Sequence, residues 1–93
     1  MKVAEVAMSE VIIYLTPWCP YCVRAKQLLE HKGQAFKEID VSRRPDLRQK
    51  MQQKSSRHTV PQIWINDEHI GGCDELYQLE RLGKLDKKLN INA

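Results

Sequence analysis

The sequence predicts a single α/β domain in which strands and helices follow the order β-α-β-α-β-β-α. Three observations lead to this prediction. Ninety-three residues suffice for one compact domain and no more. Hydrophobic residues make up 42% and charged residues 29% of the chain, as in ordinary globular proteins. Short β-branched runs alternate with stretches of helical periodicity, and prolines or glycines lie at most of the boundaries.

The first strand and the first helix carry the clearest signals. Residues 11–15 form an apolar, β-branched run that predicts a strand buried on both faces. Pro20 suits the first turn of a helix, which we expect to run to about Lys32 and to stop at Gly33. One face of this helix carries its apolar side chains, Cys22, Ala25, Leu28 and Leu29.

The next two elements are more polar. Residues 36–41 alternate weakly and predict a second strand, parallel to the first because a helix connects the two. Residues 45–54 begin with a proline and predict a second helix that is polar on most sides. Leu47 and Met51 mark its inward face.

The last third of the chain predicts a hairpin followed by a helix. Residues 60–65 form a third strand that is entered through a proline. Asn66-Asp67 is a turn signal, weaker than Asn-Gly, that leads into a short strand over residues 68–70. Residues 74–82 predict the final helix, with its leucines facing inward, namely Leu76, Leu79 and Leu82.

The N-terminal segment is expected to be a leader. Residues 1–9 carry mixed charges around a short apolar patch, so we expect a flexible leader ahead of a domain over residues 10–93. The longest uninterrupted apolar stretch is residues 11–15, which is too short to cross a membrane. The leader lacks the continuous apolar region of a signal peptide, and we therefore expect a cytoplasmic protein. The chain shows no exposed heptad pattern, which favours a monomer.

The charge balance argues against nucleic acid as a partner. The net charge is +3, and the basic residues are spread over residues 43–57 and 84–88 among nearby acidic residues. Only six aromatic residues are available for base stacking. A small anionic ligand fits this balance better than nucleic acid does.

The cysteines suggest redox chemistry. The sequence contains an odd number of them, and two residues separate the first pair: Cys19, Cys22 and Cys73. A secreted disulfide scaffold would need more, evenly paired cysteines, so the C-x-x-C pair is either redox-active or half of a metal site. A structural zinc site needs four ligands, which would require the third cysteine and a histidine. The histidines lie at a helix end, in a loop and in the hairpin, where we expect solvated side chains: His31, His58 and His69. We therefore favour redox chemistry over a metal.

The expected local structure assigns different roles to the two cysteines of the pair. Cys19 follows a buried strand and lies at the N-cap of the helix, where the unpaired N–H groups and the helix dipole stabilise a thiolate. Cys22 lies one turn later on the apolar face, so it should be partly buried and less ionised. We expect Cys19 to attack a substrate disulfide and Cys22 to resolve the product.

Three motifs in order resemble a family. The chain carries C-P-Y-C at residues 19–22, T-V-P at residues 59–61 and G-G-C-D at residues 71–74. In this order and spacing they resemble a dithiol glutaredoxin, and the resemblance covers roughly residues 10–89. A thioredoxin would carry the motif W-C-G-P-C, and a monothiol glutaredoxin would carry C-G-F-S. This chain has neither motif. The resemblance implies a thioredoxin-like fold, with a four-stranded mixed sheet and helices on both of its faces.

The resemblance also implies a glutathione groove beside Cys19. Pro61 corresponds to the family's cis-proline, and Val60 would then pair its main-chain groups with the peptide-like ligand. The amides at the start of the last helix would bind the γ-glutamyl carboxylate, and Asp74 would face the ammonium group. Arg48 takes the position of the side chain that binds the glycine carboxylate. The groove residues implied are Tyr21, Arg48, Thr59, Val60, Pro61, Gly72, Cys73 and Asp74.

Two positions qualify the resemblance. Many relatives carry a lysine three residues before the first cysteine, where this chain has Thr16, so one positive charge near the sulfur is absent. Cys73 lies at the expected groove but outside the redox pair, and we expect it to be a bystander.

The expected function is a glutathione-dependent thiol–disulfide oxidoreductase with no metal. Its partners would be glutathione and proteins that carry a glutathione mixed disulfide or a disulfide. Two alternatives remain: a thioredoxin-like hydrogen donor reduced by a flavoprotein, and an iron–sulfur carrier that bridges two chains through Cys19 and two glutathiones. The G-G-C-D segment argues against the first and Pro20 against the second.

Overall fold

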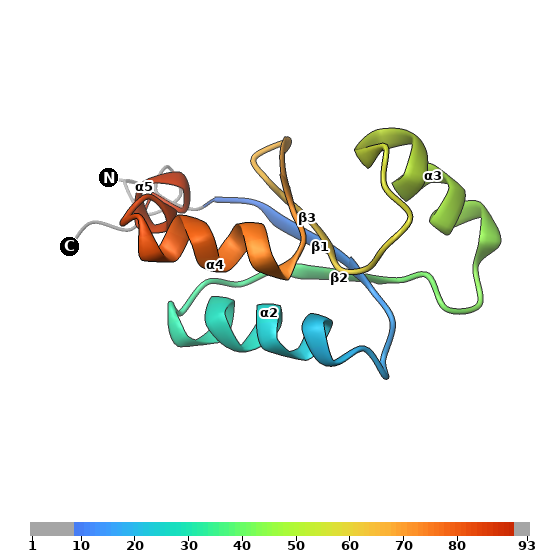
Figure 1. The fold of residues 1–93 in the computed structure, drawn as a ribbon, viewed down its shortest axis with the longest axis horizontal. Coiled ribbons are helices and arrows are strands. Elements are labelled where there is room, and N and C mark those ends of the chain that lie inside the picture. The colour runs from blue at the N-terminus through green and yellow to red at the C-terminus, as the bar shows by residue number, and fades with distance from the viewer. Residues whose placement is uncertain (1–8, 91–93) are drawn as a thin grey trace, which may run out of the picture.

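The computed structural model describes residues 9–90. Figure 1 shows the strands and helices that these residues form. In chain order they are β1 Val11–Leu15, α2 Pro20–His31, β2 Lys37–Asp40, α3 Pro45–Ser55, β3 Gln62–Ile65, β4 Glu68–Gly71, α4 Cys73–Arg81 and α5 Leu85–Lys88. The predicted element order is confirmed up to α4.

The strands form one mixed four-stranded sheet in the order β2-β1-β3-β4. Strand β1 pairs with β2 in parallel and with β3 in antiparallel, and β3 pairs with β4 in antiparallel. The turn between β3 and β4 has Asn66 and Asp67 at φ of 50° and 68°, as a tight hairpin turn with two left-handed residues requires. The predicted parallel β-α-β unit and the hairpin are therefore both confirmed.

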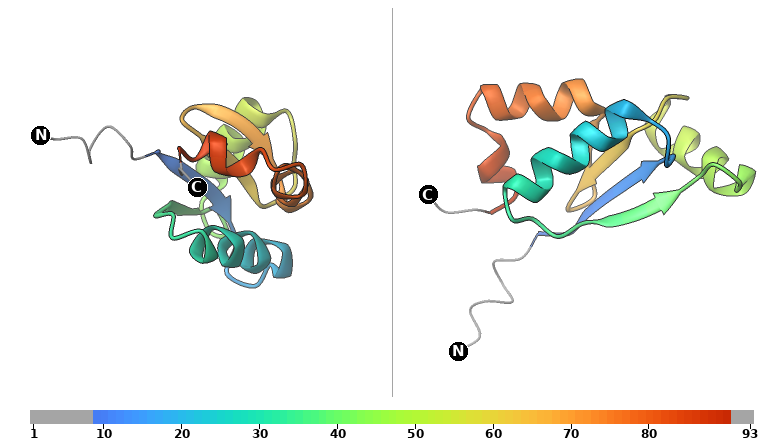
Figure 2. Two further views of the ribbon diagram at one scale, coloured as in Figure 1. Left: turned by 90° about the vertical axis from the view of Figure 1, so that its left-hand side faces the viewer. Right: turned by 90° about the horizontal axis from the view of Figure 1, so that it is seen from below.

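Helices cover both faces of the sheet. Side chains of α2, α4 and α5 pack with those of β1 and β3 in one core, which includes Ile13, Leu29 and Leu76. Figure 2 shows α2 and α4 together over this face. The other face holds a smaller core, in which Met51 of α3 packs with Tyr14 and Trp64. Because β1 and β3 pair in antiparallel, the loop that follows β1 and the loop that precedes β3 meet at the same end of the sheet.

Helix α5 is a short element that the sequence analysis did not predict. Its Leu85 and the following Leu89 are buried, four residues apart. The Nζ atom of Lys32 reaches both Glu80 of α4, at 2.7 Å, and Asp86 of α5, at 2.8 Å, which holds α5 against the rest of the domain. These two carboxylates raise the pKa of Lys32.

Three details of the predicted elements differ from the structure. Leu82 is 58% exposed, so its predicted inward orientation is wrong, because α4 ends at Arg81 and α5 takes over that part of the core. Strand β3 begins at Gln62, not at residue 60, because the proline at position 61 has no N–H to donate to a ladder. Ser9 is buried, and its main-chain oxygen accepts a hydrogen bond from Gln34, whereas the rest of the expected leader lies outside the described residues.

Within residues 9–90, no helix has the length and apolar character needed to cross a membrane.

Candidate functional site

Cys19 lies where the sheet edge meets the start of α2. Its backbone is extended, with φ of −87° and ψ of 116°, and it is the N-cap of the helix. The main-chain N–H of Cys22 donates a hydrogen bond to Cys19 Sγ at 3.0 Å. This bond uses one of the free N–H groups at the helix start, and such a donor favours a negatively charged sulfur. The predicted N-cap position of Cys19 is confirmed.

Cys22 is held in a different environment. Its side chain is buried in the core with Ala25 and Leu29, and burial together with the hydrogen bond to Cys19 raises its pKa to about 12. Cys22 therefore stays a neutral thiol near neutral pH. Both cysteines are free thiols in this structure. The predicted burial of Cys22 is confirmed, with 1% of the residue exposed.

The raised pKa of Cys22 predicts a loss of stability at alkaline pH. The unfolded thiol loses its proton near its ordinary pKa of 9.0, whereas the folded thiol keeps it up to about 12. Folding is therefore favoured below pH 9, and this contribution is lost as the pH rises from 9 to 12, by up to about 1.4 kcal/mol per pH unit. Urea unfolding under reducing conditions between about pH 8 and 11 measures this slope.

The matched control for that slope is Cys22→Ala. Removing the thiol should flatten the alkaline decline, whereas the titration of lysines and tyrosines remains the same in both proteins. Parallel declines in the two proteins would show that the Cys22 thiol does not titrate as described.

The segment before β3 forms the second side of the site. The peptide bond between Val60 and Pro61 is cis, as the resemblance to glutaredoxins implied. The Sγ–H of Cys19 points to the main-chain oxygen of Val60 at 3.7 Å. Cys19 and Val60, 41 positions apart in the chain, therefore meet at the sulfur. The main chain of the segment before β3 thus borders the Cys19 thiol.

The start of α4 forms the third side. Gly72 is its N-cap, and the Glu75 side chain turns back so that Oε1 accepts a hydrogen bond from the Gly72 N–H at 2.7 Å. That bond lowers the pKa of Glu75. Arg57 approaches the same oxygen at 3.4 Å. Gly71 has φ of +120°, and a Cβ there would lie 2.8 Å from Glu75 Oε1, so glycine is required for this close approach.

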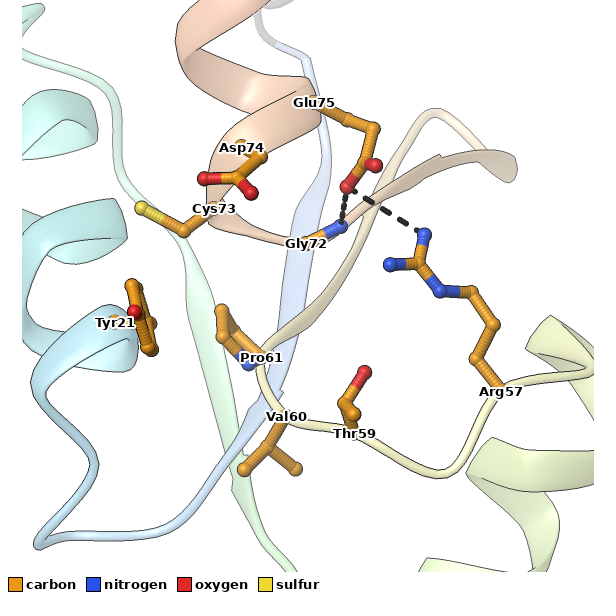
Figure 3. Close-up of a pocket in the computed structure, with 9 residues that line it drawn as sticks. All are labelled: Tyr21, Arg57, Thr59, Val60, Pro61, Gly72, Cys73, Asp74 and Glu75. Atoms are coloured by element: carbon orange, nitrogen blue, oxygen red, sulfur yellow. Dashed lines mark hydrogen bonds and ion pairs between the residues drawn. The ribbon is translucent and has the colours of Figure 1, made fainter.

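These three sides enclose a groove of about 320 Å³. Figure 3 shows Tyr21 and Arg57 at opposite sides of the groove, with Pro61 and Thr59 between them and α4 above. The lining residues are Tyr21, Arg57, Thr59, Val60, Pro61, Gly72, Cys73, Asp74 and Glu75. We call this space the Cys19 groove, since Val60 belongs to its lining and contacts the Cys19 sulfur.

Most of the expected groove residues are brought together here. Every one of them lines the Cys19 groove except Arg48, which lies on α3 outside the lining. Two lining residues were missed by the sequence analysis, Arg57 and Glu75. Glu75 stands three residues after Gly72, which is the spacing at which a side chain reaches back to a helix N-cap, so it could have been found. Arg57 gave no such signal, since it lies in a loop among other basic residues.

The remaining nucleophilic and metal-binding residues do not form a separate centre. In the described part of the chain, no group of three or more histidine, cysteine, aspartate or glutamate side chains could hold a metal ion. Burial raises the pKa of Cys73, whose side chain lies on the same side of the groove as Tyr21 (Figure 3). His31 and His58 are exposed as expected. His69 is not a solvated side chain, because its Nε2 lies 2.7 Å from Gln62 Oε1 and its ring packs on Trp64.

Comparison with known proteins agrees with this arrangement. The glutaredoxin family model matches residues 11–70. The chain is 55% identical over 83 residues to a glutaredoxin of Pseudomonas aeruginosa, which covers 89% of this chain and 99% of that protein. It is 49% identical over 82 residues to glutaredoxin 3 of Escherichia coli K12, covering 88% of this chain and 99% of that protein.

Solved structures agree as well. A glutaredoxin of Brucella melitensis superposes with a TM-score of 0.82 at 56% identity, covering 91% of this chain and 92% of that one. A buckwheat glutaredoxin in complex with glutathione superposes with a TM-score of 0.81 at 30% identity, covering 87% of this chain and 76% of that one. The sheet topology, the N-cap cysteine and these matches lead to one conclusion: the chain belongs to the glutaredoxin family of thiol oxidoreductases.

Proposed function

We propose that this protein is a dithiol glutaredoxin that reduces protein–glutathione mixed disulfides and protein disulfides with glutathione as the reductant. In the first reaction, the Cys19 thiolate attacks the glutathione sulfur of the mixed disulfide. The old S–S bond breaks, the protein leaves as a thiolate that takes up a proton, and Cys19 carries glutathione. A second glutathione thiolate then attacks this new bond, which releases oxidised glutathione and restores Cys19.

Protein disulfides require the second cysteine. Cys19 attacks one sulfur of the substrate and forms a mixed disulfide with it. Cys22 then gives up its proton, attacks Cys19 and releases the reduced substrate, so that the pair ends as a disulfide. Two glutathione molecules reduce that disulfide again. The pair therefore carries two electrons from glutathione to the substrate.

The observation that carries this proposal is the hydrogen bond from the Cys22 N–H to Cys19 Sγ at 3.0 Å, made at the edge of an open groove. The bond supports a reactive sulfur at the helix N-terminus. The neighbouring groove offers the groups that a charged tripeptide needs: main-chain groups at Val60, the N-terminal end of α4, and charged side chains.

Glutathione fits these groups in one orientation. Its γ-glutamyl carboxylate would take the amides at the start of α4, and its ammonium would face Asp74 and Glu75. Its cysteine would pair with the main chain of Val60 and place its sulfur beside Cys19. The buckwheat relative is a complex with glutathione, which supports the same ligand for this chain. We propose that the protein acts as a cytoplasmic monomer without a metal.

The experiment is turnover of a small glutathione mixed disulfide, coupled to glutathione reductase and NADPH. The proposed function predicts saturable turnover that requires the protein. A folded, fully reduced protein without turnover would contradict it. Turnover with thioredoxin reductase in place of glutathione would then favour the hydrogen-donor alternative. A brown protein that absorbs visible light after anaerobic purification would favour the iron–sulfur carrier.

Arg57 and Arg48 provide a matched test of the groove. Arg57 lines the Cys19 groove, whereas Arg48 lies on α3 outside its lining. We expect Arg57→Gln to raise the KM for the mixed disulfide by about three- to tenfold. The reason is that Arg57 would lose its charge-assisted contact to the glycine carboxylate of the bound glutathione. Arg48→Gln should raise it less. A larger effect at Arg48 would show that the glycine carboxylate binds toward α3, as the sequence resemblance implied.

A further inference from the structure

The amide side chain of Gln62 is buried and hydrogen-bonded to Thr59, which lines the Cys19 groove. Gln62 is the first residue of β3 and follows Pro61, and its side chain is fully buried, with 0% exposure. A buried amide is stable only when its donors and acceptor find partners. Its Nε2 donates to the main-chain oxygen of Thr59 at 3.0 Å and to Thr59 Oγ1 at 3.3 Å. Its Oε1 lies 2.7 Å from His69 Nε2 on β4.

These contacts allow one arrangement of the amide. The main-chain oxygen of Thr59 can only accept, so the nitrogen of Gln62 must face Thr59 and its oxygen must face His69. His69 Nε2 must then carry the proton that it donates to this oxygen. The ring of His69 is held in place on Trp64, with 4.8 Å between the ring centroids. A chain of hydrogen bonds therefore runs from β4 through Gln62 to Thr59.

Thr59 and Val60 have little other support from the sheet. Strand β3 begins at Gln62, and β1 pairs with it only as far as Tyr14 opposite Gln62. The main chain of Thr59 and Val60 thus lies beyond the paired part of β3, where it borders the Cys19 groove. There the main-chain oxygen of Val60 accepts a hydrogen bond from the Cys19 thiol. The position of these main-chain groups sets where a peptide-like ligand can pair with them.

We propose that Gln62 is a positioning residue, which fixes the Thr59–Val60 main chain in the geometry that receives glutathione. Gln62 does not line the groove itself and acts only through Thr59. The hydrogen bond from His69 Nε2 holds the Gln62 oxygen on the side away from Thr59 and so keeps the Gln62 nitrogen facing Thr59. This inference rests on the proposed function, because it concerns the affinity of the same groove.

The test is Gln62→Met, which keeps the length and the buried position of the side chain but removes its hydrogen bonds. We expect the KM for the small glutathione mixed disulfide to rise by about three- to tenfold, since a lost neutral hydrogen bond corresponds to a change of this size. The value of kcat should stay within about twofold, because the hydrogen bond from the Cys22 N–H to Cys19 does not involve Gln62.

Gln34 provides the matched control. It is also a buried glutamine, with 9% exposure, and its Nε2 donates to the main-chain oxygens of Ser9 at 3.0 Å and Ala35 at 2.8 Å, neither of which lines the groove. Gln34→Met should lower the unfolding temperature while leaving KM unchanged. His69→Phe serves as the milder second variant, because it keeps a ring on Trp64 and removes only the donor to Gln62. It should raise KM in the same direction by a smaller factor.

The outcomes separate the two claims. A wild-type protein with no turnover would overturn both the proposed function and the role of Gln62. A wild type that turns over, together with an unchanged KM in Gln62→Met, would overturn the role of Gln62 alone. If Gln62→Met does not fold, His69→Phe decides, and an unchanged KM there would equally overturn it. The same rise in KM for Gln34→Met would also overturn the specific role of Gln62, because the loss of any buried amide would then act on the groove.

Discussion

Cys19→Ser is expected to abolish turnover of both glutathione mixed disulfides and protein disulfides. The fold should survive, because serine is smaller than cysteine and can accept the same N-cap hydrogen bond from the Cys22 N–H. A hydroxyl does not form the sulfur anion that attacks a disulfide, so we expect a loss of at least about a thousandfold. The measurement is the coupled turnover assay, with the thermal unfolding temperature recorded for the same preparation.

Retained turnover in a folded Cys19→Ser protein would mean that another thiol attacks. The candidate is Cys73, whose thiol lines the groove, although burial raises its pKa. The double substitution Cys19→Ser with Cys73→Ser would then identify that thiol. The present structure favours Cys19, because its sulfur accepts a main-chain N–H at the start of a helix.

Cys22→Ser is expected to separate the two reactions. The hydrogen bond to Cys19 Sγ comes from the main-chain N–H of residue 22, so replacing the side chain leaves it in place. Turnover of glutathione mixed disulfides should therefore stay within about threefold of the wild type, because a second glutathione does the resolving. Reduction of an intramolecular protein disulfide should fall much more strongly, because the variant lacks the protein's own resolving thiol and depends on slower attack by free glutathione on the mixed disulfide.

The measurement for Cys22→Ser is a pair of assays on one preparation, one with a small glutathione mixed disulfide and one with a protein that contains a single internal disulfide. The protein substrate should accumulate as a covalent adduct on Cys19, which appears as a band of higher mass on a non-reducing denaturing gel. Equal loss in both assays would contradict the division of roles between the two cysteines.

The elements of the fold were predictable where local signals agree. The strand at residues 11–15 and the helix from Pro20 carry an apolar run, a proline start and a glycine stop, and both appear with these boundaries to within one residue. Helix α5 escaped prediction because four residues carry no measurable periodicity, and only the buried pair Leu85 and Leu89 marks it. Leu82 was predicted to face inward because α5 was not foreseen. In the structure α4 ends at Arg81, and Leu85 of α5 is buried in the core instead.

The site was predictable from motifs and less so from single residues. The C-P-Y-C, T-V-P and G-G-C-D segments meet at the Cys19 groove because β1, β3 and α4 end or begin at one edge of the sheet. Arg57 and Gln62 have no local signature, because their roles arise from contacts with Glu75 and Thr59 that exist only in the folded chain. Tertiary contacts of this kind are invisible to periodicity and spacing.

A single-turnover reaction of Cys22→Ser with a glutathionylated protein, followed by mass spectrometry of the peptide that contains Cys19, tests directly whether the Cys19 sulfur takes glutathione from the substrate. We expect that glutathione moves from the substrate to Cys19 and that the substrate leaves as a free thiol. Attachment of the substrate protein to Cys19, with release of free glutathione, would contradict it, because the groove would then not select the glutathione sulfur.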